Sequence, residues 1–123
     1  MPVPASAPSL QNRHVLLVED DYILAQELKD ELEHLGAEVL GPVYSVEDAL
    51  ALLAADPAPD TAVLDLNLGG EMVFPLADAL EVRGIPFVFL TGYEQWTWGE
   101  HHAGVPRLEK PVDIQEVARA LAG

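Results

Sequence analysis

Five short apolar runs, separated by segments with helical periodicity, limit the folds open to this 123-residue chain. The runs occupy residues 15–18, 38–43, 61–64, 87–90 and 105–108. The first run, Val15-Leu16-Leu17-Val18, is apolar throughout, as a strand buried on both faces should be, and the alternation of the runs with helical segments favours a parallel sheet. Right-handed crossovers then make a doubly wound sheet the simplest arrangement. We therefore predict an α/β fold with five parallel strands.

Capping residues and helix breakers mark the segments between the runs. Asp21 can cap a first helix, and Ser45 with Asp48 forms a capping-box signature for a second. Pro75 suits the first turn of a third helix. Weak periodicity over residues 93–104 predicts a short fourth helix, and the last segment of the chain carries a clear apolar stripe. Five helices are therefore expected.

The chain is strongly acidic, with 21 acidic against 6 basic residues and a formal net charge of −15. This charge repels nucleic-acid phosphates and anionic lipid, so we expect no direct nucleic-acid or membrane binding. Residues 1–12 are rich in Pro, Ala and Ser but lack the basic start of a signal peptide. The absence of cysteine agrees with a reducing compartment. We expect a cytoplasmic protein with a disordered lead at 1–12 and one folded domain at 13–123.

Polar residues with complementary chemistry follow four of the predicted strands. Glu19 and Asp20 follow the first strand, Asp65 the third, Thr91 the fourth and Lys110 the fifth. Because parallel strands end at the same edge of a sheet, we expect these five residues to share one rim. Clustered carboxylates repel one another, and a hard divalent cation with oxygen ligands compensates them. The pattern therefore predicts a Mg²⁺ site.

The same set of residues can accept a phosphoryl group. A carboxylate acts as a nucleophile toward phosphorus when a metal ion neutralises the developing charge. Thr91 can donate a hydrogen bond to a phosphoryl oxygen, and Lys110 supplies a mobile positive charge. We therefore predict a Mg²⁺-dependent phosphoryl acceptor.

Four sequence blocks stand at these predicted strand ends. They are VLLVEDD at 15–21, VLDLNL at 63–68, LTG at 90–92 and EKP at 109–111. Together, and in this order, they resemble the signature blocks of response-regulator receiver domains, and the similarity extends over the chain after Asn12. The resemblance implies a flavodoxin-like sheet of order 2-1-3-4-5. It also implies that a histidine kinase or a phosphotransfer protein donates the phosphoryl group.

The resemblance implies a role for each residue around the metal ion. Asp65 matches the phosphoacceptor of the family, which is also a metal ligand, and Asp20 matches a direct ligand of Mg²⁺. Glu19 stands where the family has a second acidic residue, often acting through a metal-bound water. Asn67, two residues after the acceptor, matches the position that offers its backbone carbonyl to the metal.

Thr91 matches the switch hydroxyl of the family, and Lys110 matches its lysine, whose bond to Pro111 is usually cis. Typical members carry Tyr or Phe three residues before the lysine, but this chain has Arg107, so the familiar aromatic switch cannot operate unchanged. Residues 89–93, Phe-Leu-Thr-Gly-Tyr, resemble the Phe-Ala-Thr-Gly motif of a subgroup of stand-alone receivers.

The leading interpretation is a phosphorylation-controlled binding module that is not an enzyme with a substrate of its own. Its downstream protein partner is expected to dock near Tyr93, Trp96 and Arg107. One alternative is a degenerate receiver that serves as a constitutive adaptor, which Arg107 favours. Another is a Mg²⁺-dependent phosphatase that forms an aspartyl-phosphate. Against this last reading, Asn67 occupies the position where such an enzyme would use a second acid as proton donor.

Two further features lie between the fourth and fifth strands. His101 and His102 have no second ligand at a metal-binding spacing, so both are predicted to be exposed to solvent. Tyr93, Trp96 and Trp98 form an aromatic cluster. Local packing over the edge of the sheet and an exposed partner surface are both open for this cluster.

Overall fold

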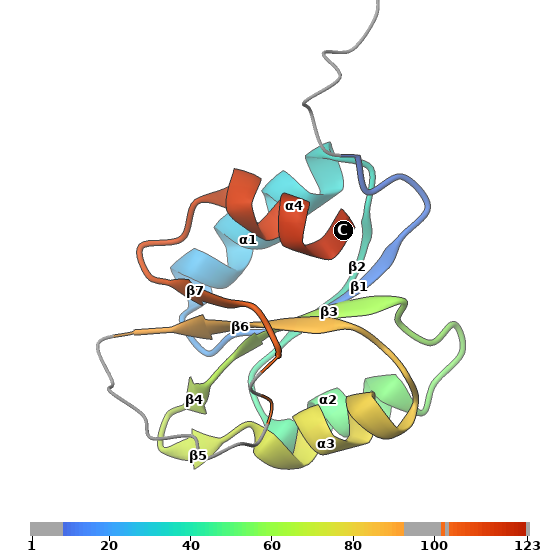
Figure 1. Ribbon diagram of the computed structural model, residues 1–123, viewed down its shortest axis with the longest axis vertical. Helices are drawn as coiled ribbons and strands as arrows, with labels where there is room; N and C mark the ends of the chain where they lie inside the picture. The colour runs from blue at the N-terminus through green and yellow to red at the C-terminus, as the bar shows by residue number, and fades with distance from the viewer. Residues whose placement is uncertain (1–8, 93–101, 103, 123) are drawn as a thin grey trace, which may run out of the picture.

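The computed structural model describes residues 9–92, 102 and 104–122, and its main element is a five-stranded parallel sheet (Figure 1). The strands are β1 (His14–Val18), β2 (Glu38–Val43), β3 (Thr61–Asp65), β6 (Phe87–Thr91) and β7 (Arg107–Glu109). Their order is β2-β1-β3-β6-β7, and all neighbouring pairs are parallel. This order corresponds to the predicted 2-1-3-4-5. The fourth and fifth strands of the sheet are labelled β6 and β7 because a two-stranded hairpin, β4 (Asn67–Leu68) and β5 (Glu71–Met72), comes before them in the chain. The predicted flavodoxin-like α/β class is confirmed.

The described residues contain four helices, whereas the sequence predicted five. They are α1 (Tyr22–His34), α2 (Val46–Leu53), α3 (Phe74–Val82) and α4 (Ile114–Ala122). The helix predicted at 93–104 falls on residues of which only 102 and 104 belong to the described part of the chain. Helices α1 and α4 cover one face of the sheet, and α2 and α3 cover the other (Figure 1). Within the described ranges, every helix is too short or too polar to cross a membrane.

Side-chain caps begin the first two helices as predicted. The Asp21 carboxylate accepts hydrogen bonds from the backbone N–H groups of Ile23 and Leu24, at 3.0 and 3.1 Å. The Ser45 hydroxyl accepts one from the Asp48 N–H at 3.1 Å. These bonds satisfy N–H groups that have no partner inside the helix, so they define where each helix starts.

The strand residues alternate between two apolar cores. Leu16 and Leu64 pack into the core beneath α2 and α3, whereas Val15 and Val63 pack into the core beneath α1 and α4. All four side chains are fully buried. Successive side chains of a strand point to opposite faces of the sheet, so a sheet covered on both sides requires apolar residues at every position. This requirement accounts for the unbroken apolar runs of the sequence.

The packed part of the chain begins earlier than the predicted boundary at residue 13. Leu10 is fully buried in the core beneath α1 and α4. Its backbone N–H donates a hydrogen bond to the Leu35 carbonyl at 3.0 Å. Leu10 therefore belongs to the folded domain and not to a disordered lead, because its apolar side chain completes the core.

Replacing Leu16 with Ala is expected to lower the free energy of unfolding by about 3 kcal/mol. Leu16 lies in β1 and is fully buried, so its truncation leaves a cavity that the neighbouring strands cannot close. Chemical denaturation measures the loss. The control is Val82→Ala, because the Val82 side chain on α3 is 87% exposed. Equal losses in the two variants would contradict the placement of Leu16 in the core.

Candidate functional site

Three carboxylates meet where β1 and β3 end. These strands are neighbours in the sheet and run in parallel, so the residues that follow them lie at the same edge. Glu19, Asp20 and Asp65 each bring one carboxylate oxygen to within 4.8 Å of the others. Glu19 and Asp65 are buried, and Asp20 is the most exposed of the three. The acids that the sequence predicted at one rim therefore do lie together.

A cleft of about 350 Å³ opens at this edge of the sheet. It is lined by Asp20, Asp21, Asp65, Asn67, Gly69, Gly70, Gly92 and Lys110. Thr91 is buried and does not belong to this lining. Instead, its backbone carbonyl accepts a hydrogen bond from the Lys110 N–H at 2.8 Å. The structure thus brings Lys110 and the acids together in the cleft, whereas Thr91 contacts the backbone of Lys110 without lining the cleft.

The Lys110 ammonium lies between two of the carboxylates. Its Nζ is 2.9 Å from Glu19 Oε1 and 3.3 Å from Asp65 Oδ2. The contact with Asp65 is a hydrogen bond, but the contact with Glu19 is an ion pair that leaves the fully buried Oε1 without a hydrogen-bond donor. The peptide bond between Lys110 and Pro111 is cis, as the resemblance implied.

Burial and neighbouring charge shift the protonation of this site. Burial raises the pKa of Asp65 from 3.8 to about 8, and the adjacent Glu19 adds to the shift, while the Lys110 charge opposes it. Burial opposes the charge of Lys110, but its bond with Glu19 and the charges of Asp65 and Glu19 outweigh burial, so its pKa is raised. The single ammonium therefore does not fully compensate the acids around it.

Replacing Asp65 with Asn is expected to raise the melting temperature by about 5 °C at alkaline pH in the presence of EDTA. The folded-state pKa of about 8 lies above the ordinary value of 3.8, so the native state holds a proton that the unfolded state releases between these values. Wild-type stability must then fall as the pH rises through this window. Thermal melts below and above this pH window measure the difference in melting temperature between Asp65→Asn and the wild type. The same difference at both pH values would contradict the raised pKa of Asp65.

A tight hairpin follows Asp65 and forms one wall of the cleft. Gly69 and Gly70 connect β4 to β5 with φ angles of +62° and +101°, the left-handed values that a two-residue hairpin turn requires. The Asn67 side-chain oxygen accepts a hydrogen bond from the Gly70 N–H at 2.7 Å, and the Asn67 N–H donates to Asp65 Oδ1 at 3.3 Å. The hairpin therefore holds Asn67 directly beside Asp65.

The donor set of the cleft fits a divalent cation. Three carboxylates face one ammonium, the buried Glu19 Oε1 lacks a hydrogen-bond donor, and burial together with the neighbouring Glu19 raises the pKa of Asp65. A hard cation that prefers oxygen ligands compensates all three features. Asp20 and Asp65 would hold such an ion, and Asn67 lines the same cleft.

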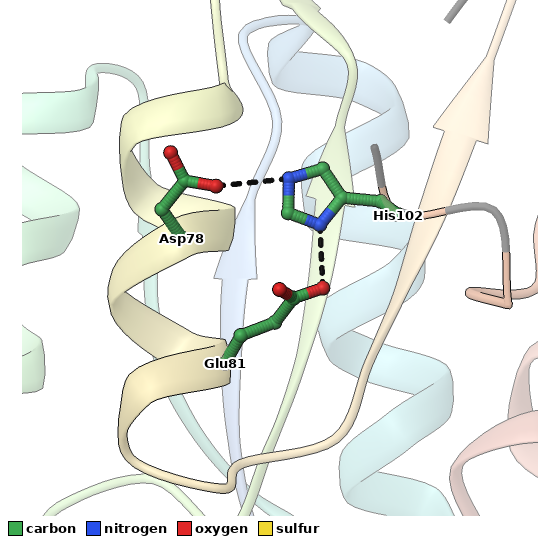
Figure 2. Close-up of side chains that lie close together, drawn as sticks. All are labelled: Asp78, Glu81 and His102. Atoms are coloured by element: carbon green, nitrogen blue, oxygen red, sulfur yellow. Dashed lines mark hydrogen bonds and ion pairs between the residues drawn. The ribbon is translucent and has the colours of Figure 1, made fainter. Parts of the chain in front are cut away.

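One sequence prediction near the site is wrong. The His102 side chain is not exposed to solvent: it is only 2% exposed and contacts Asp78 and Glu81 of α3 (Figure 2). No spacing signal could have identified these partners, because they lie more than twenty residues before His102 and meet it only when α3 packs on the sheet. His101 and the predicted aromatic cluster Tyr93, Trp96 and Trp98 lie outside the described residues.

Comparisons with known proteins agree with the fold. No protein-family model matches the chain. The solution structure of SdrG from Sphingomonas melonis Fr1 has a TM-score of 0.77 and 42% identity, and the match covers 89% of this chain and 93% of SdrG. The response regulator PhyR from Brucella abortus has a TM-score of 0.78 at 22% identity, covering 95% of this chain and 49% of PhyR. At that identity the likeness shows the fold alone.

Among curated proteins, the phyllosphere-induced regulator PhyR of Methylorubrum extorquens is 24% identical over 111 residues, which are 88% of this chain and 42% of PhyR. The chain spans less than half the length of the curated relatives that it matches. A doubly wound sheet with an acidic cleft at its carboxyl edge is the arrangement of a receiver-type fold. With 42% identity to SdrG over 93% of that protein, the chain belongs to the response-regulator receiver domains of two-component signalling.

Proposed function

We propose that the chain accepts a phosphoryl group on Asp65 from a histidine kinase or phosphotransfer protein in a Mg²⁺-dependent reaction and thereby switches protein binding. The observation that carries the proposal is the convergence of Glu19, Asp20, Asp65 and Lys110 in one cleft at the end of the sheet. SdrG, to which the chain is similar, has also been solved in a BeF₃-activated conformation, which supports acceptor chemistry in this family.

The proposed reaction is an in-line displacement at phosphorus. An Asp65 carboxylate oxygen forms the new O–P bond, the P–N bond to the donor imidazole breaks, and the imidazole nitrogen keeps the electron pair. Asp20, Asp65 and the Asn67 carbonyl would hold a Mg²⁺ ion, with Glu19 acting through a metal-bound water, and the ion would neutralise charge on the phosphoryl oxygens.

Lys110 and Thr91 respond to the new charge. The Lys110 ammonium is already 3.3 Å from Asp65 Oδ2, so a phosphoryl group on Asp65 draws it away from Glu19 by charge-assisted hydrogen bonds. Because the Lys110 N–H is bonded to the Thr91 carbonyl, this movement reaches the end of β6. The Thr91 hydroxyl then turns toward the phosphoryl oxygens.

The output we propose is a protein partner that docks near Tyr93, Trp96 and Arg107. Residues 89–93 are similar to the Phe-Ala-Thr-Gly motif of stand-alone receivers, and we assign the chain to that subgroup. The domain acts as a cytoplasmic binding module and has no small-molecule substrate of its own.

A second candidate function is a constitutive adaptor. Arg107 is exposed on the edge strand β7 at the position of the usual switch aromatic, and the buried Thr91 does not line the cleft. Both features favour an output surface that is independent of phosphorylation.

Acetyl phosphate with Mg²⁺ tests the proposal on the purified protein. Intact mass should increase by one phosphoryl group in the wild type and remain unchanged in Asp65→Asn. Asp56→Asn, an exposed residue at the opposite end of the sheet, should behave like the wild type. An unmodified wild type would contradict the acceptor role. Modification with no change in tryptophan fluorescence would favour the adaptor.

A further inference from the structure

His102 makes a second cluster of charged side chains, outside the cleft and on the other side of β6. Its Nε2 lies 3.1 Å from Asp78 Oδ1, and its Nδ1 lies 2.6 Å from Glu81 Oε1 (Figure 2). Asp78 and Glu81 are one turn apart on α3 and are exposed, whereas the imidazole between them is 2% exposed. The ring is thus buried with a carboxylate at each of its two nitrogens.

Aromatic side chains enclose the faces and edges of the same ring. The ring of Phe74 stacks on it, with an interplanar angle of 7° and 5.9 Å between centroids. Phe87 and Phe89 of β6 approach it edge to face at 6.0 and 5.9 Å. These phenylalanines carry no charge, so Asp78 and Glu81 are the ionisable partners that the described residues place against the ring. Water has little access to either nitrogen.

The geometry is satisfied by the protonated form of His102. A neutral imidazole has one N–H donor and one lone pair, so it can donate to only one of the two carboxylates. The other nitrogen would then direct its lone pair at a carboxylate oxygen, which is repulsive. An imidazolium would donate the hydrogen bond to Glu81 and form an ion pair with Asp78, and both contacts would be charge-assisted. Each carboxylate contacts a different ring nitrogen, so these two contacts account for the cluster.

The chain that follows His102 continues through β7 to Lys110, which lines the cleft. His102 has a φ of +60°, which is sparsely populated for non-glycine residues and needs surrounding contacts to hold it. Its carbonyl accepts a hydrogen bond from the Val105 N–H at 3.1 Å, and the Pro106 carbonyl then accepts one from Phe89 at 2.9 Å. Strand β7 follows, and Lys110 comes immediately after it.

Strand β7 needs an anchor at its start. It is three residues long and lies at the edge of the sheet, so β6 is its only neighbouring strand in the described residues. Short edge strands are held by few hydrogen bonds and open easily. The side chain of His102 ties the chain to α3 five residues before β7 begins.

We propose that His102 is a positioning residue that anchors the start of β7 to α3 through Asp78 and Glu81 and thereby holds Lys110 in the cleft. Loss of the imidazole or of its two carboxylate partners removes these contacts, so substitution at either end should weaken the anchor. The consequence for signalling rests on the function proposed above, but the anchor itself operates in the unphosphorylated protein.

Amide hydrogen exchange of the unphosphorylated protein at one fixed pH tests the anchor. The amides to follow are those of Val105 and Lys110, with Leu16 in β1 as the internal reference. In His102→Gln, protection at Val105 and Lys110 should be about tenfold lower than in the wild type, as expected for one lost charge-assisted hydrogen bond. Protection at Leu16 should not change.

Variants separate the anchor from a general loss of structure. Asp78→Asn with Glu81→Gln removes both acceptor charges at exposed positions and should lower the protection at Val105 to about the level of His102→Gln. His14→Gln is the matched control, because His14 also lies between two carboxylates, Glu38 and Asp60, but at the other end of the sheet.

The outcomes are distinct. Wild-type protection at Val105 in His102→Gln, or in the Asp78/Glu81 double variant, would overturn the anchor. A response in His14→Gln equal to that in His102→Gln would overturn its location. None of these measurements uses phosphorylation, so the anchor and the acceptor function fail or succeed separately.

Discussion

Replacing Asp20 with Asn is expected to slow the phosphorylation of Asp65 by about 100-fold, because loss of a direct metal ligand removes several kcal/mol of charge stabilisation from the transition state. Asp20 is the most exposed carboxylate of the cluster, so the substitution leaves the core intact. The rate of mass gain from acetyl phosphate at fixed Mg²⁺ measures the effect. EDTA should reduce the wild-type rate at least as strongly.

The dependence of the phosphorylation rate on Mg²⁺ concentration distinguishes a metal site that binds more weakly from a metal site that has been lost. In Asp20→Asn, a large excess of Mg²⁺ should recover part of the rate, since Asp65 and the Asn67 carbonyl remain. An Asp20→Asn rate equal to the wild-type rate at every Mg²⁺ concentration would exclude Asp20 as a ligand.

The architecture of the domain could be predicted from the sequence because the three central strands, β1, β3 and β6, are buried on both faces. Residues such as Val15 and Leu16 point to opposite cores, so the sequence shows an unbroken apolar run rather than an alternating pattern. The helix starts at Asp21 and Ser45 were also predictable, because a cap is a local interaction between a side chain and nearby N–H groups.

The hairpin after Asp65 was predicted only as a loop. Two glycines between short segments are a recognised signal for a two-residue turn, and Gly69-Gly70 carries that signal. The paired segments β4 and β5 have two residues each, too short for any periodicity to be visible. The turn at Gly69-Gly70 could therefore be predicted from the sequence, but the pairing of β4 with β5 could not.

The cluster around His102 could not be predicted for a different reason. Local patterns give the ends of strands, and the topology of a parallel sheet then brings Glu19, Asp65 and Lys110 to one edge. No such rule relates a residue before β7 to the outer surface of α3. The contact depends on how α3 packs against Phe87 and Phe89, and packing of this kind is decided by the tertiary structure alone.

Replacing Lys110 with Ala is expected to lower the free energy of unfolding by about 3 kcal/mol at pH 8 without Mg²⁺, because it leaves Glu19 buried without its cation. Glu19 is fully buried, and Lys110 Nζ lies 2.9 Å from it. The raised pKa of Lys110 means that its stabilising charge is present at every pH below the ordinary value of 10.5. Chemical denaturation at pH 8 measures the loss.

Three comparisons identify the missing charge as the cause of that loss. Lys110→Met keeps most of the apolar contacts of the side chain, so it should be nearly as unstable as Lys110→Ala. Added Mg²⁺ should restore stability to both variants, since a cation in the cleft again compensates the acids. The variants should then bind Mg²⁺ yet show no conformational response to phosphorylation, because the ammonium that moves from Glu19 to the phosphoryl group is absent. A full response in Lys110→Met would show that the signal leaves the cleft by another route, of which the Asn67 hairpin beside Asp65 is the nearest.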